Sequence, residues 1–379
     1  MTNTTIHAIR ATKTIIKSAL FLGTITLITA SCDKTEEVIE PQKAIAVEAL
    51  ASKGTETLMS LSATVKAVPT SYNYTVSNAA GFVAALAKVK AGEAIFLSAN
   101  GVFDFTNYAT IKIPANVTIY SSRNRIYSGT SRSAGAKIIT NNKNIHPLFK
   151  IMGPNVRISG IRILGPDTAA NIALMKQLIP AGTQWKYAYS RAIESSYDYL
   201  EVDNCEIAGW SHAGIYLTGG KNAAIHDNNF HHIQRYGTGY GVCLNGGTAL
   251  VTRNTFDWMR HAIAGTGIVG EEYESSYNTL GNHFIAEPFD MHGGKDRKDG
   301  TNIAGSYVYI HHNTSYFTGF RTVLINGVPV NGVKVTNNSF IQKTEFEAIR
   351  LDAATTNKTV TGNVYSIPVK SLVVALISY

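Results

Sequence analysis

The hydrophobic and polar positions of this chain repeat through its second half with a period too short for a globular domain. Between residues 204 and 363 one short phrase recurs: a few strand-forming residues, an Asn, any residue, and then usually an apolar or aromatic residue. The units are rich in Val, Ile, Thr, Tyr and Phe and are separated by Gly and Asn, so they predict short strands and turns. The seven marker residues, 24 to 31 positions apart, are Asn204, Asn228, Asn254, Asn282, Asn313, Asn338 and Asn363.

The unit from 223 to 247 shows what one repeat predicts. Residues 223–226, 230–233 and 240–244 predict three short strands, with a turn at 227–229 and a closing Asn-Gly-Gly at 245–247. A period of this length indicates stacked supersecondary units, and three strands per unit predict one coil of a parallel β-helix. The repeated Asn predicts a structural role, since Asn tolerates the left-handed conformation of a sharp bend and its amide can bond the amide of the next coil.

This organisation resembles the pectate-lyase-like superfamily of right-handed parallel β-helix proteins, over about residues 71–379. The resemblance implies an all-β fold with a single-domain solenoid. Residues 78–90 are amphipathic, with Phe82, Leu86 and Val89 on one face, and resemble the helix that caps the N-terminal end of these solenoids. The superfamily includes lyases, hydrolases, epimerases and inert adhesins, so the resemblance implies the fold more firmly than the function.

Residues 1–31 predict a lipoprotein signal peptide. Arg10, Lys13 and Lys17 precede an apolar stretch at 18–30 that is too short to span a membrane. The sequence Ile-Thr-Ala-Ser-Cys at 28–32 resembles a bacterial lipobox, which implies lipidation of Cys32. The alternative is an ordinary secretory signal with an incidental Cys.

The residues after Cys32 extend this expectation. The acidic run at 33–37 resembles the export signal of surface lipoproteins in the Bacteroidetes. Residues 32–70 have no clear periodicity and predict a tether before the β-helix domain at 71–379. We therefore expect a monomer anchored in the bacterial outer membrane, on the cell surface or the periplasmic face.

Charge and cysteine content narrow the classes of partner. The formal net charge of +8 is spread along the chain without a nucleic-acid-binding module, which argues against a nucleic-acid partner and favours an acidic polysaccharide. Cys205 and Cys243 are one and a half coils apart, so we expect two reduced thiols packed in the interior. The candidate groove lacks clustered acids, so we predict no metal and no other cofactor.

The period breaks at two places, which predict insertions. Residues 165–191 contain Trp185, Tyr187 and Tyr189, and residues 293–300 form a Gly-, Lys- and Asp-rich stretch. Insertions in repeat proteins usually decorate the binding face. We expect both to wall a groove.

Polar and titratable residues recur seven to twelve positions after the marker Asn residues. Successive coils lie about 4.8 Å apart, so these residues predict one stripe along the groove. Ile215, Val242, Ile263, Met291 and Ile349 are expected inside. The stripe contains His212, Tyr236, Tyr240, Arg260, His261, Asp290, His292, Arg321 and Arg350.

This stripe favours β-elimination from a uronic acid polymer. A His beside Asp290 suits the general base. Arg260 or Arg321 suits the group that neutralises the substrate carboxylate, and Tyr236 or Tyr240 the group that protonates the leaving oxygen. We predict a polysaccharide lyase with His261, His292, Asp290, Tyr240 and Arg260 as catalytic residues and with His212, Tyr236, Arg321, Arg350 and Lys295 as substrate-binding residues.

Three alternatives stay open. Residues 289–292, Phe-Asp-Met-His, resemble the Asp-Pro-His centre of β-helical mannuronan C5-epimerases, although Met291 replaces the Pro and Gly293 stands where an acid is expected. A glycoside hydrolase needs two carboxylates, for which Asp257, Glu287 and Asp290 are the candidates. A non-catalytic glycan-binding lipoprotein would show a groove lined with aromatic residues.

Overall fold

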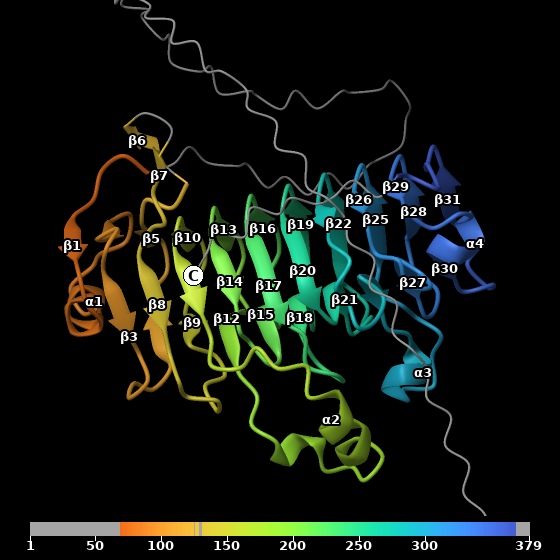
Figure 1. Cartoon of the computed structure of the whole chain (residues 1–379), viewed down its shortest axis with the longest axis horizontal. Coiled ribbons are helices and arrows are strands. Elements are labelled where there is room, and N and C mark those ends of the chain that lie inside the picture. The colour runs from red at the N-terminus through yellow and green to blue at the C-terminus, as the bar shows by residue number, and fades with distance from the viewer. Residues whose placement is uncertain (1–68, 125, 129–130, 369–379) are drawn as a thin grey trace, which may run out of the picture. The chain divides into compact units, whose positions relative to one another are not determined.

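The computed structural model describes residues 69–124, 126–128 and 131–368. The expected signal peptide, Cys32 and nearly all of the expected tether lie outside these residues. Within them, three long parallel sheets form a single-domain right-handed parallel β-helix, and the chain passes through each sheet once per coil (Figure 1). The short strands and frequent Gly and Asn corners of the sequence produce this winding, because each coil must bend sharply three times.

Sheet 1 holds eleven of the described strands. In spatial order they are β1 (Tyr74–Val76), β2 (Ala94–Leu97), β5 (Thr118–Tyr120), β10 (Arg157–Ser159), β13 (Glu201–Asp203), β16 (Ala223–His226), β19 (Thr248–Thr252), β22 (Glu272–Ser276), β25 (Tyr307–His311), β28 (Gly332–Thr336) and β31 (Lys358–Thr361).

Sheets 2 and 3 hold nine described strands each. Sheet 2 contains β3 (Val102–Asp104), β8 (Lys137–Ile139), β11 (Arg162–Leu164), β14 (Glu206–Ala208), β17 (Asn229–Ile233), β20 (Thr255–Met259), β23 (Thr279–Leu280), β26 (Thr314–Ser315) and β29 (Ser339–Phe340). Sheet 3 contains β4 (Ile111–Ile113), β9 (Phe149–Ile151), β12 (Arg191–Ser195), β15 (Ala213–Leu217), β18 (Tyr240–Leu244), β21 (His261–Gly265), β24 (Phe289–Met291), β27 (Val323–Ile325) and β30 (Ile349–Leu351).

Apolar residues in register fill the interior. In sheet 3 one buried row runs through Ile193, Ile215, Val242, Ile263, Phe289, Val323 and Ile349. Phe289, rather than the expected Met291, occupies this row. Met291 is also buried, but it pairs with Gly265 and Ile325 in the next inward row. Asp290 therefore points outward between two inward residues, because side chains alternate along a strand.

Helix α1 (Ala79–Leu86) lies at the N-terminal end of the stack (Figure 1). It begins at Asn78, whose side chain accepts a hydrogen bond from the backbone N–H of Gly81 at 2.9 Å, and it ends earlier than the expected residue 90. Phe82 is completely buried, with its ring centroid 5.9 Å from that of Phe105 and 6.1 Å from that of Phe149. The helix thus covers the apolar interior of the first coils.

A ladder of Asn amides connects six coils, and it corrects two of the seven expected positions. In each step one Asn Nδ2 donates to the Oδ1 of the next Asn at 3.0 to 3.1 Å, through Asn228, Asn254, Asn278, Asn313, Asn338 and Asn363. Asn278 replaces the expected Asn282, which is exposed and accepts from Thr318 instead. Asn204 lies one residue too early, and the backbone N–H of Cys205 donates to Asn228 Oδ1 at 2.9 Å.

The left-handed bend expected at the ladder Asn falls on the residue before it. Five of the six residues there have φ from 53° to 56°: Asp227, Arg253, Tyr277, His312 and Asn337. The sixth, Gly362, has φ 67°, and Asn204 makes the same bend before Cys205 with φ 54°. Only one of the five is Asn, so the bend is held by the coils around it rather than by residue preference.

Both cysteines in the described residues, Cys205 and Cys243, are free and buried, as predicted. Four further elements lie outside the three sheets. The antiparallel strands β6 (Ile126–Ser128) and β7 (Ser131–Arg132) form a hairpin, and helices α3 (Gly294–Arg297) and α4 (Glu345–Ala348) are each one turn long. None of the helices in the described part of the chain has the length and apolarity needed to cross a membrane.

Candidate functional site

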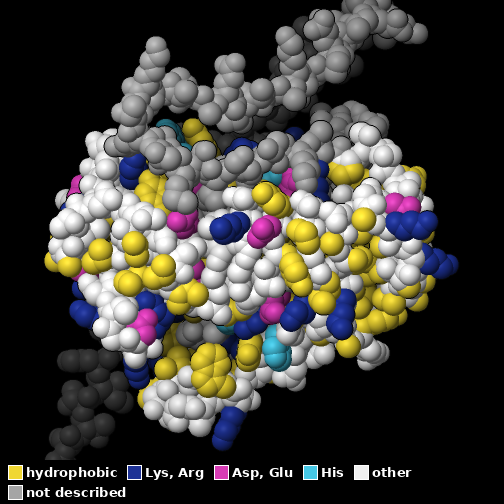
Figure 2. Space-filling model, turned by 180° about the vertical axis from the view of Figure 1, so that it is seen from behind, with side chains coloured by type: hydrophobic (Ala, Val, Ile, Leu, Met, Phe, Trp, Pro, Cys, Tyr) yellow, Lys and Arg dark blue, Asp and Glu magenta, His cyan; other side chains and the backbone are white. Residues whose placement is uncertain are grey.

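The insertion at 165–191 folds into helix α2 (Ile172–Leu178) and the 3₁₀ helix η1 (Gln184–Lys186), and it projects below sheet 3 (Figure 1). A cavity of about 700 Å³ lies between it and the corners that lead from sheet 2 into sheet 3. Its wall is formed by Met175, Ile179, Gln184, Trp185, Tyr187, Tyr189, Arg235, Tyr236, Gly237, Thr238, Arg260, Ile285, Ala286, Glu287, Phe317 and Phe320. The space-filling view from behind shows hydrophobic, basic and His side chains gathered along this lower edge (Figure 2).

Arg235 attaches the insertion to the coils. Its guanidinium is buried, donates to Asp167 Oδ2 at 2.6 Å and to the carbonyl of Ala188, and lies 4.3 Å above the ring of Tyr187. The backbone N–H of Tyr236 donates to the carbonyl of Ala170 at 2.9 Å. Both ends of the insertion are therefore held by one short corner of the β-helix.

The core of the expected stripe is present on sheet 3. Tyr240 and His261 are in register on β18 and β21, with parallel rings 5.7 Å apart. Arg260 precedes β21, lines the cavity, and donates from Nη1 to the hydroxyl of Tyr240 at 3.1 Å. The sequence therefore placed these three residues on the correct face.

Asp290 and His292 form a carboxylate–imidazole pair at the end of β24. Nε2 of His292 lies 2.9 Å from Oδ2 of Asp290, and Nδ1 lies 3.8 Å from Asp296 in α3. The Asp290 side chain is 4% exposed and that of His292 is 34% exposed. A buried carboxylate thus orients an imidazole that solvent and substrate can reach.

His261 is placed differently from His292. Its side chain is 1% exposed, Nδ1 donates to the carbonyl of Glu287, and Nε2 lies 3.5 Å from Asp290 Oδ2. Burial lowers the pKa of His261 to about 3, and the positive charge of Arg260 lowers it further. His261 is neutral near pH 7 and faces Asp290 rather than the groove.

The same environment sets the ionisation of its neighbours. The hydrogen bond to Asp290 raises the pKa of His292, and this gain exceeds the opposing effect of burial. Burial alone would raise the pKa of Asp290, but the nearby His261 and the hydrogen bond from His292 hold it below its usual value. Burial raises the pKa of Tyr240 to about 12, so its phenol keeps its proton.

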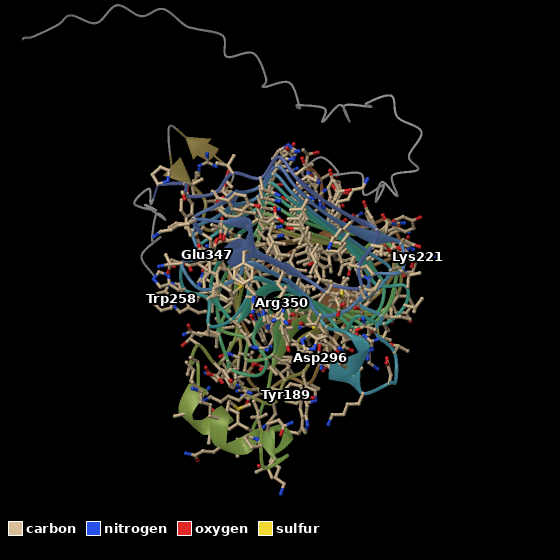
Figure 3. All side chains as sticks on the ribbon, turned by 90° about the vertical axis from the view of Figure 1, so that its right-hand side faces the viewer. Tyr189, Lys221, Trp258, Asp296, Glu347 and Arg350 are labelled. Atoms are coloured by element: carbon tan, nitrogen blue, oxygen red, sulfur yellow. The ribbon has the colours of Figure 1, made fainter. Side chains whose placement is uncertain are left out.

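The expected substrate-binding residues divide into two groups. Tyr236 lines the cavity, with Lys176 Nζ 5.9 Å from its ring centre. Arg350 is exposed and shares an outward row with Asp290 and Leu324. Seen along the coil stack, Tyr189 and Asp296 lie below Arg350, on the side of the insertion (Figure 3).

The other three expected substrate-binding residues, like Arg350, are not among the residues that line the cavity. His212 is buried, accepts from Arg191 Nε at 2.6 Å, and has a pKa well below its usual value because of burial and the charge of Arg191. Arg321 lies 4.7 Å from the ring centre of Phe320. Lys295 is exposed on α3, so the second insertion does not wall this cavity as predicted.

The carboxylates proposed for a hydrolase do not converge. Asp257 is on sheet 2, where its Oδ2 lies 2.9 Å from His283 Nδ1. Glu287 is the single carboxylate among the described residues that line the cavity. Asp290 is engaged with His292, so no two of the three candidates face each other across the cavity.

The sequence repeat does not predict several of the cavity residues. Gln184, Phe317 and Phe320 line it, and Phe320 is 52% exposed. The aromatic residues of the insertion are the feature of the sequence that indicated this cavity, because they predict a partly apolar site. By contrast Phe317 and Phe320 lie between sheets 2 and 3 in a later coil, where the phrase has no fixed register.

One group of described residues has spacing suited to a metal ion: Glu201, Asp203 and His226 on sheet 1. Asp203 already binds Arg157 through two hydrogen bonds of 2.8 and 3.0 Å. The guanidinium therefore occupies the place of a cation at this carboxylate, and the group is remote from the cavity wall.

Comparisons with known proteins agree with the geometry. Residues 191–365 match the family described as right handed beta helix region. The structure is similar to an alginate lyase from Paenibacillus sp., with a TM-score of 0.52, 13% identity and coverage of 77% of this chain and 97% of the other. It is also similar to a family 28 exopolygalacturonase from Yersinia enterocolitica, with a TM-score of 0.50, 12% identity and coverage of 76% and 62%. No curated protein matches the chain. The family match over the later coils and the two similar structures thus support the right-handed parallel β-helix fold of this chain.

Proposed function

We propose that the protein is a polysaccharide lyase that cleaves an acidic polysaccharide by β-elimination on the outer face of sheet 3. The observation that carries this proposal is the Asp290–His292 pair beside Arg260. The pair supplies an oriented base, and Arg260 supplies a cation for a uronic acid carboxylate. The alginate lyase among the similar structures supports this choice of reaction on this fold.

The roles follow from exposure and hydrogen bonding. Neutral His292 takes the proton next to the substrate carboxylate, and Asp290 holds its ring and stabilises the charge that develops. Arg260 pairs with that carboxylate, which makes the proton easier to remove. The carbon–oxygen bond of the leaving sugar breaks as the carbon–carbon double bond forms, and Tyr240, whose phenol stays protonated, gives its proton to the leaving oxygen.

His292 suits the base better than His261. An imidazole that is 1% exposed and bonded to a backbone carbonyl does not reach a substrate. We therefore place His261 behind Asp290, as a buried neighbour of the pair that does not act as the base. This assignment separates the two histidines, which the sequence left as equal candidates.

A second candidate function is favoured by the aromatic wall of the cavity. Trp185, Tyr187, Tyr189 and Tyr236 are four of its lining residues, and a groove rich in aromatic residues suits a glycan-binding protein without catalysis. A hydrolase is less favoured, since only one carboxylate lines the cavity among the described residues. A C5-epimerase shares the proton abstraction and remains distinguishable by its products.

The expected site of action is the bacterial outer membrane. The lipobox-like sequence ending at Cys32 supports a lipid anchor there, for a monomer on the cell surface or the periplasmic face. Metabolic labelling with a fatty acid, compared between the natural chain and Cys32→Ser, tests the anchor. Label in the Cys32→Ser variant would contradict it.

The deciding experiment incubates the purified full chain with pectin, alginate, ulvan and glycosaminoglycans. Ultraviolet absorbance of the unsaturated uronyl end and new reducing ends are followed together. A lyase gives both signals on the same polymer. Reducing ends without absorbance would indicate a hydrolase, epimerised residues without cleavage an epimerase, and binding without either signal a glycan-binding protein.

A further inference from the structure

We infer that the cavity beneath the insertion at 165–191 is a binding site for one uronic acid residue, and that Arg235 is the positioning residue that forms it by holding the insertion against the coils. The inference rests on the proposed function for its class of substrate. It adds the cavity that holds the residue bound by Arg260, and a residue, Arg235, that no part of the reaction uses.

The cavity walls suit the apolar face of a sugar ring. Trp185 on the insertion is 65% exposed, and Tyr236 and Phe320 line the same space from the coil corners. These rings come from both sides of the cavity. A volume of about 700 Å³ falls within the range of about 300 to 1,000 Å³ that is typical of small-molecule sites.

Two polar groups in the wall lack the partners that a uronic acid would supply. Arg260 has no carboxylate within ion-pair distance among the described residues, and its hydrogen bond is to the neutral hydroxyl of Tyr240. The Oε1 atom of Gln184 is buried without a hydrogen-bond donor. A ligand that brings a carboxylate to Arg260 and a hydroxyl to Gln184 satisfies both groups, which a neutral sugar or a simple carboxylic acid does not.

The polar groups also connect this site with the proposed reaction. Arg260 lies on the wall of the cavity and directly precedes His261, whose Nε2 lies 3.5 Å from Asp290 Oδ2. A uronic acid residue held by Arg260 is therefore on the same side of the coils as the carboxylate–imidazole pair. The cavity acts as the subsite that brings the polymer to the base.

Arg235 determines whether this wall exists. Its guanidinium binds Asp167 at the start of the insertion and Ala188 at its end, so one side chain closes the loop between these two residues. Ile179 packs against Gly237, where an added Cβ would lie 2.6 Å from the Ile179 side chain. A lysine at 235 keeps the charge but cannot make the forked contact, so the insertion would lose one of its two attachments.

The first experiment measures binding of monosaccharides to the full chain by isothermal titration. The probes are galacturonate, glucuronate and mannuronate, with galactose, glucose and mannose as their neutral counterparts. At least one uronate binds more tightly than its neutral counterpart, and Arg260→Gln weakens that binding about tenfold to a hundredfold. The control Arg253→Gln, at the Asp227 ion pair on another corner, leaves it unchanged. Equal binding of acid and neutral sugars, or no binding of any uronate, would overturn the inference.

The second experiment tests Arg235 with Arg235→Lys and the matched control Arg253→Lys. Trypsin cleaves at Lys176 and Lys186 in the insertion, and we expect these cuts to be about ten times faster in Arg235→Lys alone. On the polymer that the natural chain cleaves, Arg235→Lys raises KM while kcat changes little. Unchanged proteolysis and unchanged KM would show that Arg235 does not hold the wall.

The two proposals fail separately. A chain that binds a uronate through Arg260 but never releases unsaturated products overturns the lyase and keeps the binding site. A chain that releases such products at the same rate in Gln184→Leu, Trp185→Ala and Arg235→Lys keeps the lyase and overturns the site.

Discussion

The imidazole of His292 is bonded through Nε2 to Oδ2 of Asp290 at 2.9 Å, while its opposite nitrogen points away from that carboxylate toward Asp296. A carboxylate that is 4% exposed thus holds an imidazole that is 34% exposed. Replacing His292 by Gln should lower kcat/KM by at least about a hundredfold, because general base catalysis contributes about 10² to 10⁴. Initial rates of double-bond formation measure it.

His283→Gln is the matched control for that substitution. His283 is also bonded to a carboxylate, Asp257 of β20, at 2.9 Å, but it lies after β23 and is not among the residues that line the cavity. Its replacement should leave kcat/KM unchanged. Equal losses from His283→Gln and His292→Gln would remove the assignment of His292 as the base.

The rate should rise with pH through a midpoint above 6.5. The hydrogen bond to Asp290 raises the pKa of His292 above its usual value of 6.5, and only the neutral imidazole takes a proton. In Asp290→Asn the raising contribution is lost, so the midpoint should move to lower pH. Profiles of kcat/KM for the two chains give the comparison, and a midpoint that does not move would contradict it.

Stability should change in the opposite sense over the same pH range. Since the pKa of His292 is higher in the folded chain than in the unfolded one, the pair stabilises the fold fully below pH 6.5 and loses this contribution as pH rises through the folded pKa. The difference in free energy of unfolding between the natural chain and His292→Gln should shrink above that pH. A difference that grows with pH would be inconsistent with a raised pKa.

Asn278→Ala should lower the free energy of unfolding by about 2–4 kcal/mol, because it leaves the buried backbone N–H of Asn254 without an acceptor and removes the amide bond from Asn254 Nδ2. Asn282→Ala, four residues away on the surface, should cost less than about 1 kcal/mol. Urea denaturation of both variants measures the two costs. A larger loss of stability in Asn282→Ala than in Asn278→Ala would indicate that Asn282, and not Asn278, belongs to the ladder.

The two interior thiols should be unreactive in the folded chain. Burial raises the pKa of Cys205 to about 12 and also raises that of Cys243, so neither forms the reactive thiolate near pH 8. In a Cys32→Ser chain, an alkylating reagent should label no cysteine before denaturation and two afterwards, by mass spectrometry. Rapid labelling of the folded chain would contradict the burial.

Strand positions were readable from the sequence because the period of apolar residues is local. The unit at 223–247 gives β16, β17 and β18 within one residue of the expected bounds. Which Asn belongs to the ladder was harder to predict, because Asn278 and Asn282 are each followed two positions later by an apolar residue. Only the hydrogen bond between coils distinguishes them. Spacing was the overlooked signal, as Asn278 follows Asn254 by 24 residues.

The candidate site was partly readable for the same reason. Asp290 and His292 share a strand end, so their proximity follows from alternation. The buried orientation of His261 is fixed by its hydrogen bond to the carbonyl of Glu287, which is 26 residues away. A local sequence pattern does not contain this contact. The cavity wall is still harder to predict from the sequence. The insertion lies outside the repeat, so the repeat does not say which residues of the coils it contacts.

The amide ladder continues from Asn278 to Asn313 across 35 residues as tightly as across the 24 before it. The stacking of the coils therefore does not depend on the length of the segment that connects two ladder Asn residues. Segments of very different length can replace one another between Asn278 and Asn313 while the coils stay in register. The specificity of the groove can therefore change without any change in the β-helix that supports it.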